Sequence, residues 1–371
     1  MKKSMVGLLV AIFLLGGSFG VAYAIPEYFT PLAAACPGTV CTACHTSTDG
    51  PPPLTDYGTA FSNIPTHSTN PSGAIATLGC PGDQLTVSKS GTGNVTVTST
   101  PAGINCGTAC SATFAVGASV SLTETPDAAT TFTGWSGACK NNVSTCLITM
   151  NSDQSVTAHY LTAGTTSFSD VPSGSTFQSY IEAIYNNGIT IGCGNGDYCP
   201  SADVSRDQMA AFLVRATQVS EGSQPEGFTC NGTVDCSTTT PYFSDVLSTN
   251  GFFKYIQKLK ELGITVGCGS GDYCPSNNVT RDQMAAFLIR ATQVVAGQGT
   301  ENFTCNGNVD CSTTTPYFND VPSINGFFKY IQKLKELGIT LGCGNGNYCP
   351  SENVTRDQKA AFLSRAFLGM Q

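Results

Sequence analysis

The residues of this chain whose types and spacing could do chemistry lie near its N-terminus. There, Cys41-Thr42-Ala43-Cys44-His45 forms a Cys-x-x-Cys-His motif. Two thiols one helical turn apart can bond to the two vinyl groups of a haem, and the histidine that follows can ligate the iron. The motif therefore predicts one covalently attached c-type haem held by Cys41, Cys44 and His45.

The second axial ligand of such an iron is expected at His67. No methionine lies between Met5 and Met150, and the remaining histidine, His159, falls in an expected strand of the next module. Bis-histidine ligation would give a lower potential than ligation by histidine and methionine. Alternatively, His67 is an exposed loop residue.

Three other interpretations of the motif remain open. The two cysteines could form a small disulfide, the spacing could arise by chance, or Cys36 could join Cys41, Cys44 and His45 in a zinc site. Thiolate zinc sites are uncommon outside the cytosol, and the N-terminus carries an export signal. The haem prediction is therefore favoured.

Residues 1–24 have the features of a secretory signal peptide. Two lysines precede an apolar run from Val6 to Leu15, and Ala22-Tyr23-Ala24 offers a cleavage site. The run is short for a membrane span, so the mature chain is expected to be exported with no transmembrane segment, although an uncleaved anchor is an alternative. Which face of the envelope it occupies stays open.

The charge balance argues against nucleic acid as a partner. Among the 371 residues, 17 are Lys or Arg and 25 are Asp or Glu, and signal removal takes away Lys2 and Lys3. A chain this acidic is repelled by phosphate backbones and by anionic membrane surfaces.

The 18 cysteines of an exported chain are expected to be oxidised or otherwise occupied. Fourteen fall in close pairs, and Cys36 and Cys80 could form an eighth if Cys41 and Cys44 hold haem. The close pairs are Cys106/Cys110, Cys139/Cys146, Cys193/Cys199, Cys230/Cys236, Cys268/Cys274, Cys305/Cys311 and Cys343/Cys349.

Residues 25–79, the predicted haem-binding segment, resemble the short monohaem c-type cytochrome domains of exported bacterial proteins. In those domains the motif precedes a stretch like Tyr57-Gly58-Thr59-Ala60-Phe61. The resemblance implies electron transfer with redox partner proteins. This segment is shorter than an ordinary soluble cytochrome c and lacks a ligand methionine.

Residues 80–162 are predicted to form a β-rich module closed by disulfides. Apolar and polar residues alternate at 85–88, 95–98, 120–123 and 156–160, as in half-buried strands. Trp135 is interpreted as a core residue rather than a ligand platform. The segments 101–107 and 132–137 resemble bacterial β-repeat modules of surface proteins and adhesins, which implies a spacer or an adhesive module.

The rest of the chain is a three-fold repeat, because Phe168, Phe243 and Phe318 stand 75 residues apart. The repeats span residues 163–222, 241–297 and 316–371. The connectors 223–240 and 298–315 each contain a close cysteine pair and are expected to form disulfide-closed hairpins. A calcium loop around Asn231 and Asp235 is an alternative that offers few ligands.

Each repeat is predicted to fold as a helix, a disulfide-closed loop and a second helix. In the middle repeat, Gly263 ends the first helix, and Asp245 or Ser248 could cap its start. Thr280-x-x-Gln283 predicts a capping box that opens the second helix. The expected core stripes are Phe252, Ile256, Leu259 and Leu262 in the first helix and Met284, Phe287, Leu288 and Ala291 in the second.

These repeats resemble the S-layer homology (SLH) family. The resemblance rests on Phe-x-Asp-Val, Gly-Ile-Thr-x-Gly, a Thr-Arg pair and an Ala-Phe-Leu-x-Arg-Ala helix, each present in three related copies. It implies a three-lobed helical bundle with pseudo-three-fold symmetry that holds an exported protein to cell-wall glycan.

The same resemblance nominates glycan-binding residues. In the family, a Thr-Arg-Ala-Glu-like motif contributes to grooves for anionic, often pyruvylated, wall polymer; here that motif ends in Asp-Gln. The family's frequent first-helix tryptophan is replaced by Thr176, Gly251 and Gly326. The nominated residues are Arg206, Arg281, Arg356, Asp170, Asp245, Asp320, Gly192, Gly267 and Gly342.

A guanidinium can bind a carboxylate or phosphate through two parallel hydrogen bonds, and three such groups would make a multivalent anion-binding surface. In the alternative interpretation, each arginine pairs with a neighbouring aspartate such as Asp282 and only stabilises the bundle.

Together these patterns predict a multidomain α+β protein: a small haem-binding segment, a β module and an α-helical SLH bundle. The expected function is a non-enzymatic protein anchored to the envelope through polysaccharide and carrying one haem for electron transfer. The alternative is a purely structural S-layer or adhesion protein without haem.

Overall fold

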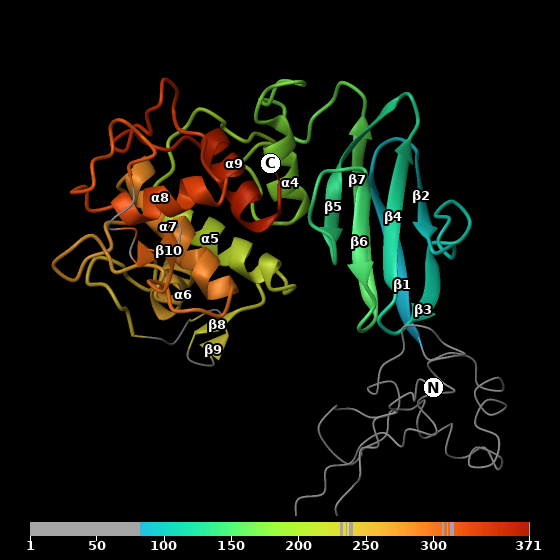
Figure 1. Cartoon of the computed structure of the whole chain (residues 1–371), viewed down its shortest axis with the longest axis horizontal. Coiled ribbons are helices and arrows are strands. Elements are labelled where there is room, and N and C mark those ends of the chain that lie inside the picture. Colours follow the sequence, from blue (N-terminus) through green and yellow to red (C-terminus); the bar gives the residue numbers. More distant parts are fainter. Residues whose placement is uncertain are drawn as a thin grey trace, which may run out of the picture. The chain divides into compact units, whose positions relative to one another are not determined.

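The computed structural model describes residues 82–230, 233–234, 236, 240–305, 308–309, 311 and 315–370. Figure 1 shows the strands β1–β7 and the helices α4–α9 of this part of the chain. The signal peptide, the predicted haem residues Cys41, Cys44, His45 and His67, and the candidate calcium ligands Asn231 and Asp235 lie outside the described residues.

The β module contains two sheets, with strand orders β3-β1-β7-β5 and β2-β4-β6. Strands β1 and β7 pair in parallel, whereas β5 with β7, β2 with β4 and β4 with β6 pair antiparallel. The bounds are β1 Gly82–Gly91, β2 Val95–Thr100, β3 Ser111–Ala115, β4 Ser119–Pro126, β5 Thr130–Gly137, β6 Thr145–Thr149 and β7 Gln154–Thr162.

Alternating burial forms the core of this module. In β4, Val120 and Leu122 are buried while Ser121 between them is half-buried and Thr123 is exposed, and buried and more exposed residues alternate in β2 as well. The four predicted strands therefore correspond to β1, β2, β4 and β7. Trp135 is 1% exposed and donates its indole N–H to the carbonyl of Val143 at 3.0 Å, which confirms it as a core residue.

Three strands of the module escaped prediction, and β5 gives the clearest reason. A bulge between Phe132 and Gly134 breaks its alternation, so that Thr133, Gly134 and Trp135 are buried in succession. The period-two signal is absent from such a strand because the bulge turns consecutive side chains toward one face.

All seven predicted close cysteine pairs are disulfides. In the two connectors, the disulfides close hairpins made of β8 Thr229–Cys230 with β9 Thr233–Val234 and of β10 Thr304–Cys305 with β11 Asn308–Val309. The predicted hairpins are therefore confirmed.

Each repeat contains a short helix followed by a longer one. The bounds are α4 Gln178–Asn186, α5 Arg206–Ser220, α6 Phe253–Glu261, α7 Arg281–Val295, α8 Phe328–Glu336 and α9 Arg356–Phe367. Helix α6 ends as predicted, because Gly263 has a φ of 71°. The Gly263 and Ile264 amides donate to the carbonyls of Lys260 and Leu259, each at 3.0 Å, in a Schellman motif.

The predicted capping boxes are wrong in their bonding, although Ser205, Thr280 and Thr355 do occupy the N-cap positions. The Thr280 hydroxyl donates to the Asp282 carboxylate and does not accept a hydrogen bond from the helix backbone. The same carboxylate accepts from the backbone N–H of Gln283 at 2.7 Å. Asp282 thus binds the backbone N–H at the helix start that a capping box would satisfy, and the side chain of Gln283 contacts Arg206 instead. Asp245 and Ser248 do not cap α6, whose N-cap is Phe252.

The three repeats close into a ring around their second helices. The amide of Val204 donates to Val354, that of Val354 to Val279, and that of Val279 to Val204, at 2.9 to 3.0 Å. Helices α5, α7 and α9 pack against one another, and α4, α6 and α8 pack against α9, α5 and α7. The first repeat therefore contacts the last, in agreement with the expected pseudo-three-fold arrangement, and one continuous core joins all three.

Candidate functional site

Arg206, Arg281 and Arg356 begin α5, α7 and α9, and each reaches into a neighbouring repeat. Arg206 Nε donates to the carbonyl of Tyr273 at 2.8 Å, and the Tyr273 hydroxyl donates to the carbonyl of Arg206 at 2.7 Å. The same reciprocal pair joins Arg281 to Tyr348 and Arg356 to Tyr198. These arginines therefore fasten the repeats together.

The three guanidinium groups are nevertheless only partly satisfied. Each arginine is 4 to 5% exposed, yet its Nη2 is buried without a hydrogen-bond partner among the described residues. The Arg206 Cζ lies 4.8 Å from the Tyr273 ring centre and 5.4 Å from that of Phe287. A buried cationic N–H group without an acceptor is costly, and an anion is the kind of ligand that would satisfy it.

A groove of about 280 Å³ surrounds Arg206, and all three repeats contribute to it. We call it the Arg206 groove. Its other lining residues are Thr265, Val266, Gly267, Cys268, Asn277, Gln283, Ala286, Phe287, Arg290 and Phe327. Aromatic and aliphatic walls around a guanidinium suit a ligand that carries both an anionic group and C–H faces.

The alternative in which the arginines pair with neighbouring aspartates does not describe their bonds. Arg281 Nε donates to a backbone carbonyl, and its Nη1 approaches the side-chain oxygen of Gln358 at 3.5 Å. Asp282 is instead engaged by Thr280 and Gln283 at the helix start.

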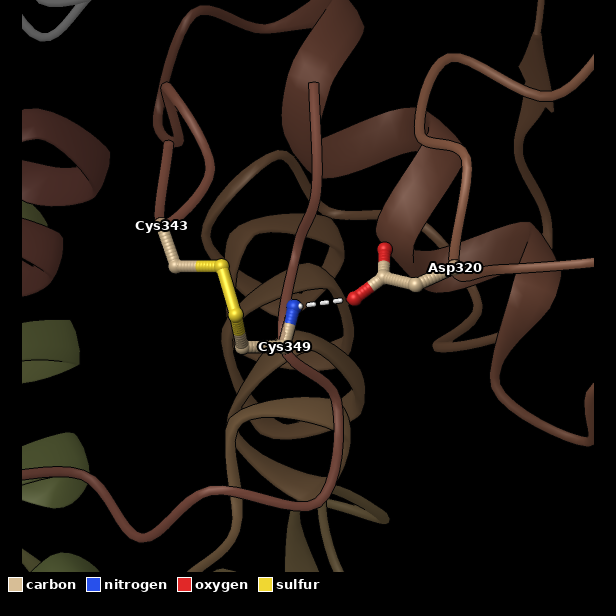
Figure 2. A group of neighbouring side chains, drawn as sticks. All are labelled: Asp320, Cys343 and Cys349. Carbon is tan, nitrogen blue, oxygen red and sulfur yellow. Dashed lines mark hydrogen bonds between the residues drawn. A yellow bond between two sulfur atoms is a disulfide. The ribbon is translucent and has the colours of Figure 1, made fainter. Parts of the chain in front are cut away.

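The nominated aspartates hold the disulfide-closed loops. Asp320 accepts hydrogen bonds from the amides of Tyr348 and Cys349, both at 2.7 Å, and Figure 2 shows the second of these beside the Cys343–Cys349 disulfide. Asp170 and Asp245 make the same two bonds in their repeats. The Asp320, Cys343 and Cys349 cluster is not a metal centre, because its sulfurs are bonded to each other.

The three glycines that were predicted to bind glycan adopt backbone conformations that favour glycine, at the start of each disulfide-closed loop. Gly267 has a φ of 95°, and a Cβ there would lie 2.4 Å from the Asp272 carbonyl oxygen and 2.9 Å from Phe243 Cε1. Gly192 and Gly342 have the same restriction. These positions therefore require glycine for backbone reasons, whatever the ligand.

Two residues that line the Arg206 groove, Gln283 and Val266, were not among the predicted glycan-binding residues. Gln283 Oε1 accepts from Arg206 Nη1 at 3.4 Å, so the Asp-Gln ending of the motif orients the guanidinium. Val266 lines the groove and is 70% exposed, and its equivalents Ile191 and Leu341 are 78 and 73% exposed. The sequence does contain a pattern that indicates these exposed residues, because the variable position of Gly-Ile-Thr-x-Gly is aliphatic in all three copies.

Comparison with known proteins agrees with this architecture. Residues 167–210, 242–285 and 317–360 match the S-layer homology domain, and residues 84–164 match the divergent InlB B-repeat domain. The chain is 27% identical over 198 residues to an endoglucanase of Bacillus sp. (strain KSM-635), covering 53% of this chain and 18% of that protein.

Two S-layer proteins are similar over the same part of the chain. That of Bacillus licheniformis is 25% identical over 200 residues, and S-layer protein EA1 of Bacillus anthracis is 26% identical over 200 residues. Each match covers 53% of this chain, and 19 and 20% of the respective protein. The chain thus spans about a fifth of the length of these relatives.

The chain therefore carries three SLH repeats and a divergent InlB B-repeat domain, and it is an exported, cell-surface protein. None of the helices in the described ranges combines the length and hydropathy that a membrane span requires. The resemblance to cytochromes concerns residues outside the described part and stays a prediction.

Proposed function

We propose that the three SLH repeats hold this protein at the cell surface by binding an anionic wall polysaccharide in the grooves around Arg206, Arg281 and Arg356. One observation carries the proposal. Each arginine has one side fixed to a neighbouring repeat and a buried Nη2 group without an acceptor.

The chemistry of the Arg206 groove supports this class of ligand. A carboxylate or phosphate can accept from the guanidinium, while the C–H faces of a sugar pack against Val266, Phe287 and Phe327. A polymer can engage several grooves at once, so modest affinity at each becomes firm retention. Because the chain is acidic overall, attraction to an anionic polymer must come from such local sites rather than from net charge.

The test uses groove-edge residues, because the arginines also maintain the bundle. In the full mature chain, Ile191, Val266 and Leu341 are changed together to Asp, which places a negative charge at the edge of each groove. Co-sedimentation with purified cell walls should weaken by about tenfold or more per groove.

The matched control changes Leu247 and Ile324 to Asp. These residues are 65 and 91% exposed and do not line the Arg206 groove. The control should sediment with walls like the wild type, and both variants should keep the wild-type melting temperature. Equal retention of wild type and triple variant would overturn the proposal, as would full retention on walls stripped of their anionic polymer.

The proposed function also includes one c-type haem on Cys41, Cys44 and His45, with His67 as second axial ligand and electron transfer as its role. The support is the Cys-x-x-Cys-His motif behind an export signal. Expression in a host that matures cytochromes should give a Soret band that survives acid-acetone extraction, and Cys41→Ser with Cys44→Ser should abolish it. His67→Ala should alter the low-spin spectrum.

A mature protein without covalent haem would leave the alternative function, a purely structural S-layer or adhesion protein. The β module, residues 84–164, would act as a spacer with or without haem, because it separates the N-terminal segment from the three SLH repeats along the chain. Wall retention is independent of this outcome, so the two parts of the proposal can fail separately.

A further inference from the structure

One position breaks the three-fold symmetry inside the bundle. The residue three places after the groove arginine is Met209 in α5, Met284 in α7 and Lys359 in α9. All three side chains are 0% exposed. Two of the three arginines are therefore followed, one helical turn later, by a buried apolar side chain, and the third, Arg356, by a buried amine.

Lys359 lies against the same aromatic rings as Arg356. Its Nζ is 3.4 Å from the ring centre of Phe212 and 5.2 Å from that of Tyr198. The Arg356 Cζ lies 5.5 and 5.0 Å from the same two ring centres. We call the surroundings of Arg356, Tyr198, Phe212 and Gln208 the Arg356 groove, by equivalence with the Arg206 groove.

The Arg356 groove also concentrates unsatisfied polar atoms. Lys359 Nζ, Arg356 Nη2 and Gln208 Oε1 are all buried without a hydrogen-bond partner in the part of the chain that the structure describes. In the other two grooves, the equivalent glutamine oxygens of Gln283 and Gln358 accept from the arginine. Two buried nitrogen donors without acceptors are costly, and an anion is the kind of group that would satisfy both.

We propose that Arg356 and Lys359 together make this groove the strongest anion-binding groove of the three, and that it takes the carboxylate or phosphate of a charged sugar residue. The inference rests on the proposed function, because it assigns one groove of the wall-binding repeats to the charged part of the polysaccharide. An anion bound to Arg356 experiences both charges across a site walled by aromatic rings, where screening by water is weak.

A proton accompanies the anion. Burial lowers the pKa of the Lys359 ammonium well below its usual value, and the nearby Arg356 and Arg215 lower it further, while Asp357 opposes them. The Tyr198 phenol is the other titratable group against it, and burial keeps it protonated. An anion favours the charged lysine, so binding takes up a proton and weakens as pH rises.

The experiment titrates the full mature chain with methyl β-D-glucuronide and with glucose 6-phosphate, using methyl β-D-glucoside as the neutral control. Calorimetry in two buffers of different ionisation enthalpy measures proton uptake at pH 8. The variant is Lys359→Met, which reproduces the residue of the other two grooves and should fold. Lys333→Met, which removes a surface charge paired with Glu336, is the matched control.

Wild type should bind one of the two anionic sugars and not the neutral glucoside. Binding of the glucuronide would identify a carboxylate site, and binding of glucose 6-phosphate a phosphate site. Lys359→Met should weaken the tightest site by about tenfold and abolish proton uptake, with a melting temperature at or above that of wild type. Lys333→Met should leave both binding and proton uptake unchanged.

Equal affinity and proton uptake in wild type and Lys359→Met would overturn this inference and leave the proposed function standing. Binding of neither anionic sugar by wild type would overturn it as well. Failure of the proposed function is separate, since it appears as unchanged wall retention in the triple groove-edge variant.

Discussion

The β module and the three-repeat bundle differ in what they bury. In the β module, the least exposed side chains include Leu85, Leu122 and Trp135, and the indole N–H has its acceptor. The bundle buries four cationic side chains, those of Arg206, Arg281, Arg356 and Lys359. Each of the four keeps a buried nitrogen without a partner among the described residues. The described core of the β module is thus mainly apolar, with Glu124 as a buried exception, whereas the core of the bundle also contains four cationic side chains.

Ionisable residues of the two parts behave accordingly. In the β module, burial lowers the pKa of His159 to about 4, so its ring is neutral at physiological pH and shares a 2.6 Å hydrogen bond with Ser136. In the bundle, burial lowers the pKa of Arg206, but guanidinium remains charged at any physiological pH. Burial therefore leaves the histidine of the β module neutral, whereas the arginine of the bundle keeps its charge.

The largest effect is expected from Trp135→Ala in the β module. Removing this buried ring should lower the free energy of unfolding by about 4 kcal/mol, because it leaves a cavity and orphans the Val143 carbonyl. Hydrogen exchange should show lost protection between residues 84 and 164, while α5, α7 and α9 stay protected and wall binding persists. Equal loss of protection in the helices would show that the two parts share one stability.

Next in size is Gly267→Ala beside the Arg206 groove. The new Cβ would meet the Asp272 carbonyl oxygen and the Phe243 ring, so we expect about 3 kcal/mol of destabilisation in chemical denaturation. Gly251→Ala is the matched control, because nothing lies within 4 Å of a Cβ there, and it should change stability by about 0.5 kcal/mol or less. Similar values for both would show that the loop can relax.

A smaller effect is expected from Tyr273→Phe, which removes only the hydroxyl bonded to the carbonyl of Arg206. The cost should be about 1 to 1.5 kcal/mol, and the loosened Arg206 should bind walls less firmly. Tyr185→Phe provides the control, since that ring is 42% exposed. If Tyr273→Phe kept full stability, the reciprocal pair would not be joining the repeats.

The smallest effect concerns Glu226 in the first connector. Burial alone would raise the pKa of its carboxyl, but hydrogen bonds from Lys254, Arg215 and Tyr255 outweigh this and lower it below the ordinary 4.5. The unfolded chain therefore takes up protons first, and the stability that the carboxylate provides at neutral pH is lost as pH falls below about 4.5. Glu226→Gln should flatten this acid limb in melts from pH 6 to pH 3.

The local parts of the fold could be predicted from the residues alone. The Gly263 helix stop, the seven disulfides and the helix-loop-helix order depend on contacts within a few residues of one another. The hydrogen bonds of the N-cap residues could not be predicted, because a hydroxyl, a carboxylate and a glutamine side chain can each bind the backbone at the start of the second helix. Only the geometry decides that Asp282 accepts from Thr280 while Gln358, from the next repeat, meets Arg281.

The three-fold repeat alone shows which residues recur in the sequence: an arginine, a glycine and an aspartate in each repeat, and a methionine that is replaced once by Lys359. The tertiary structure decided their roles. Closure of the ring brings Arg356 from the last repeat onto Tyr198 of the first, 158 residues away. That contact shields the Arg356 guanidinium from water and leaves its Nη2 without an acceptor among the described residues, which no pattern in one repeat alone could show.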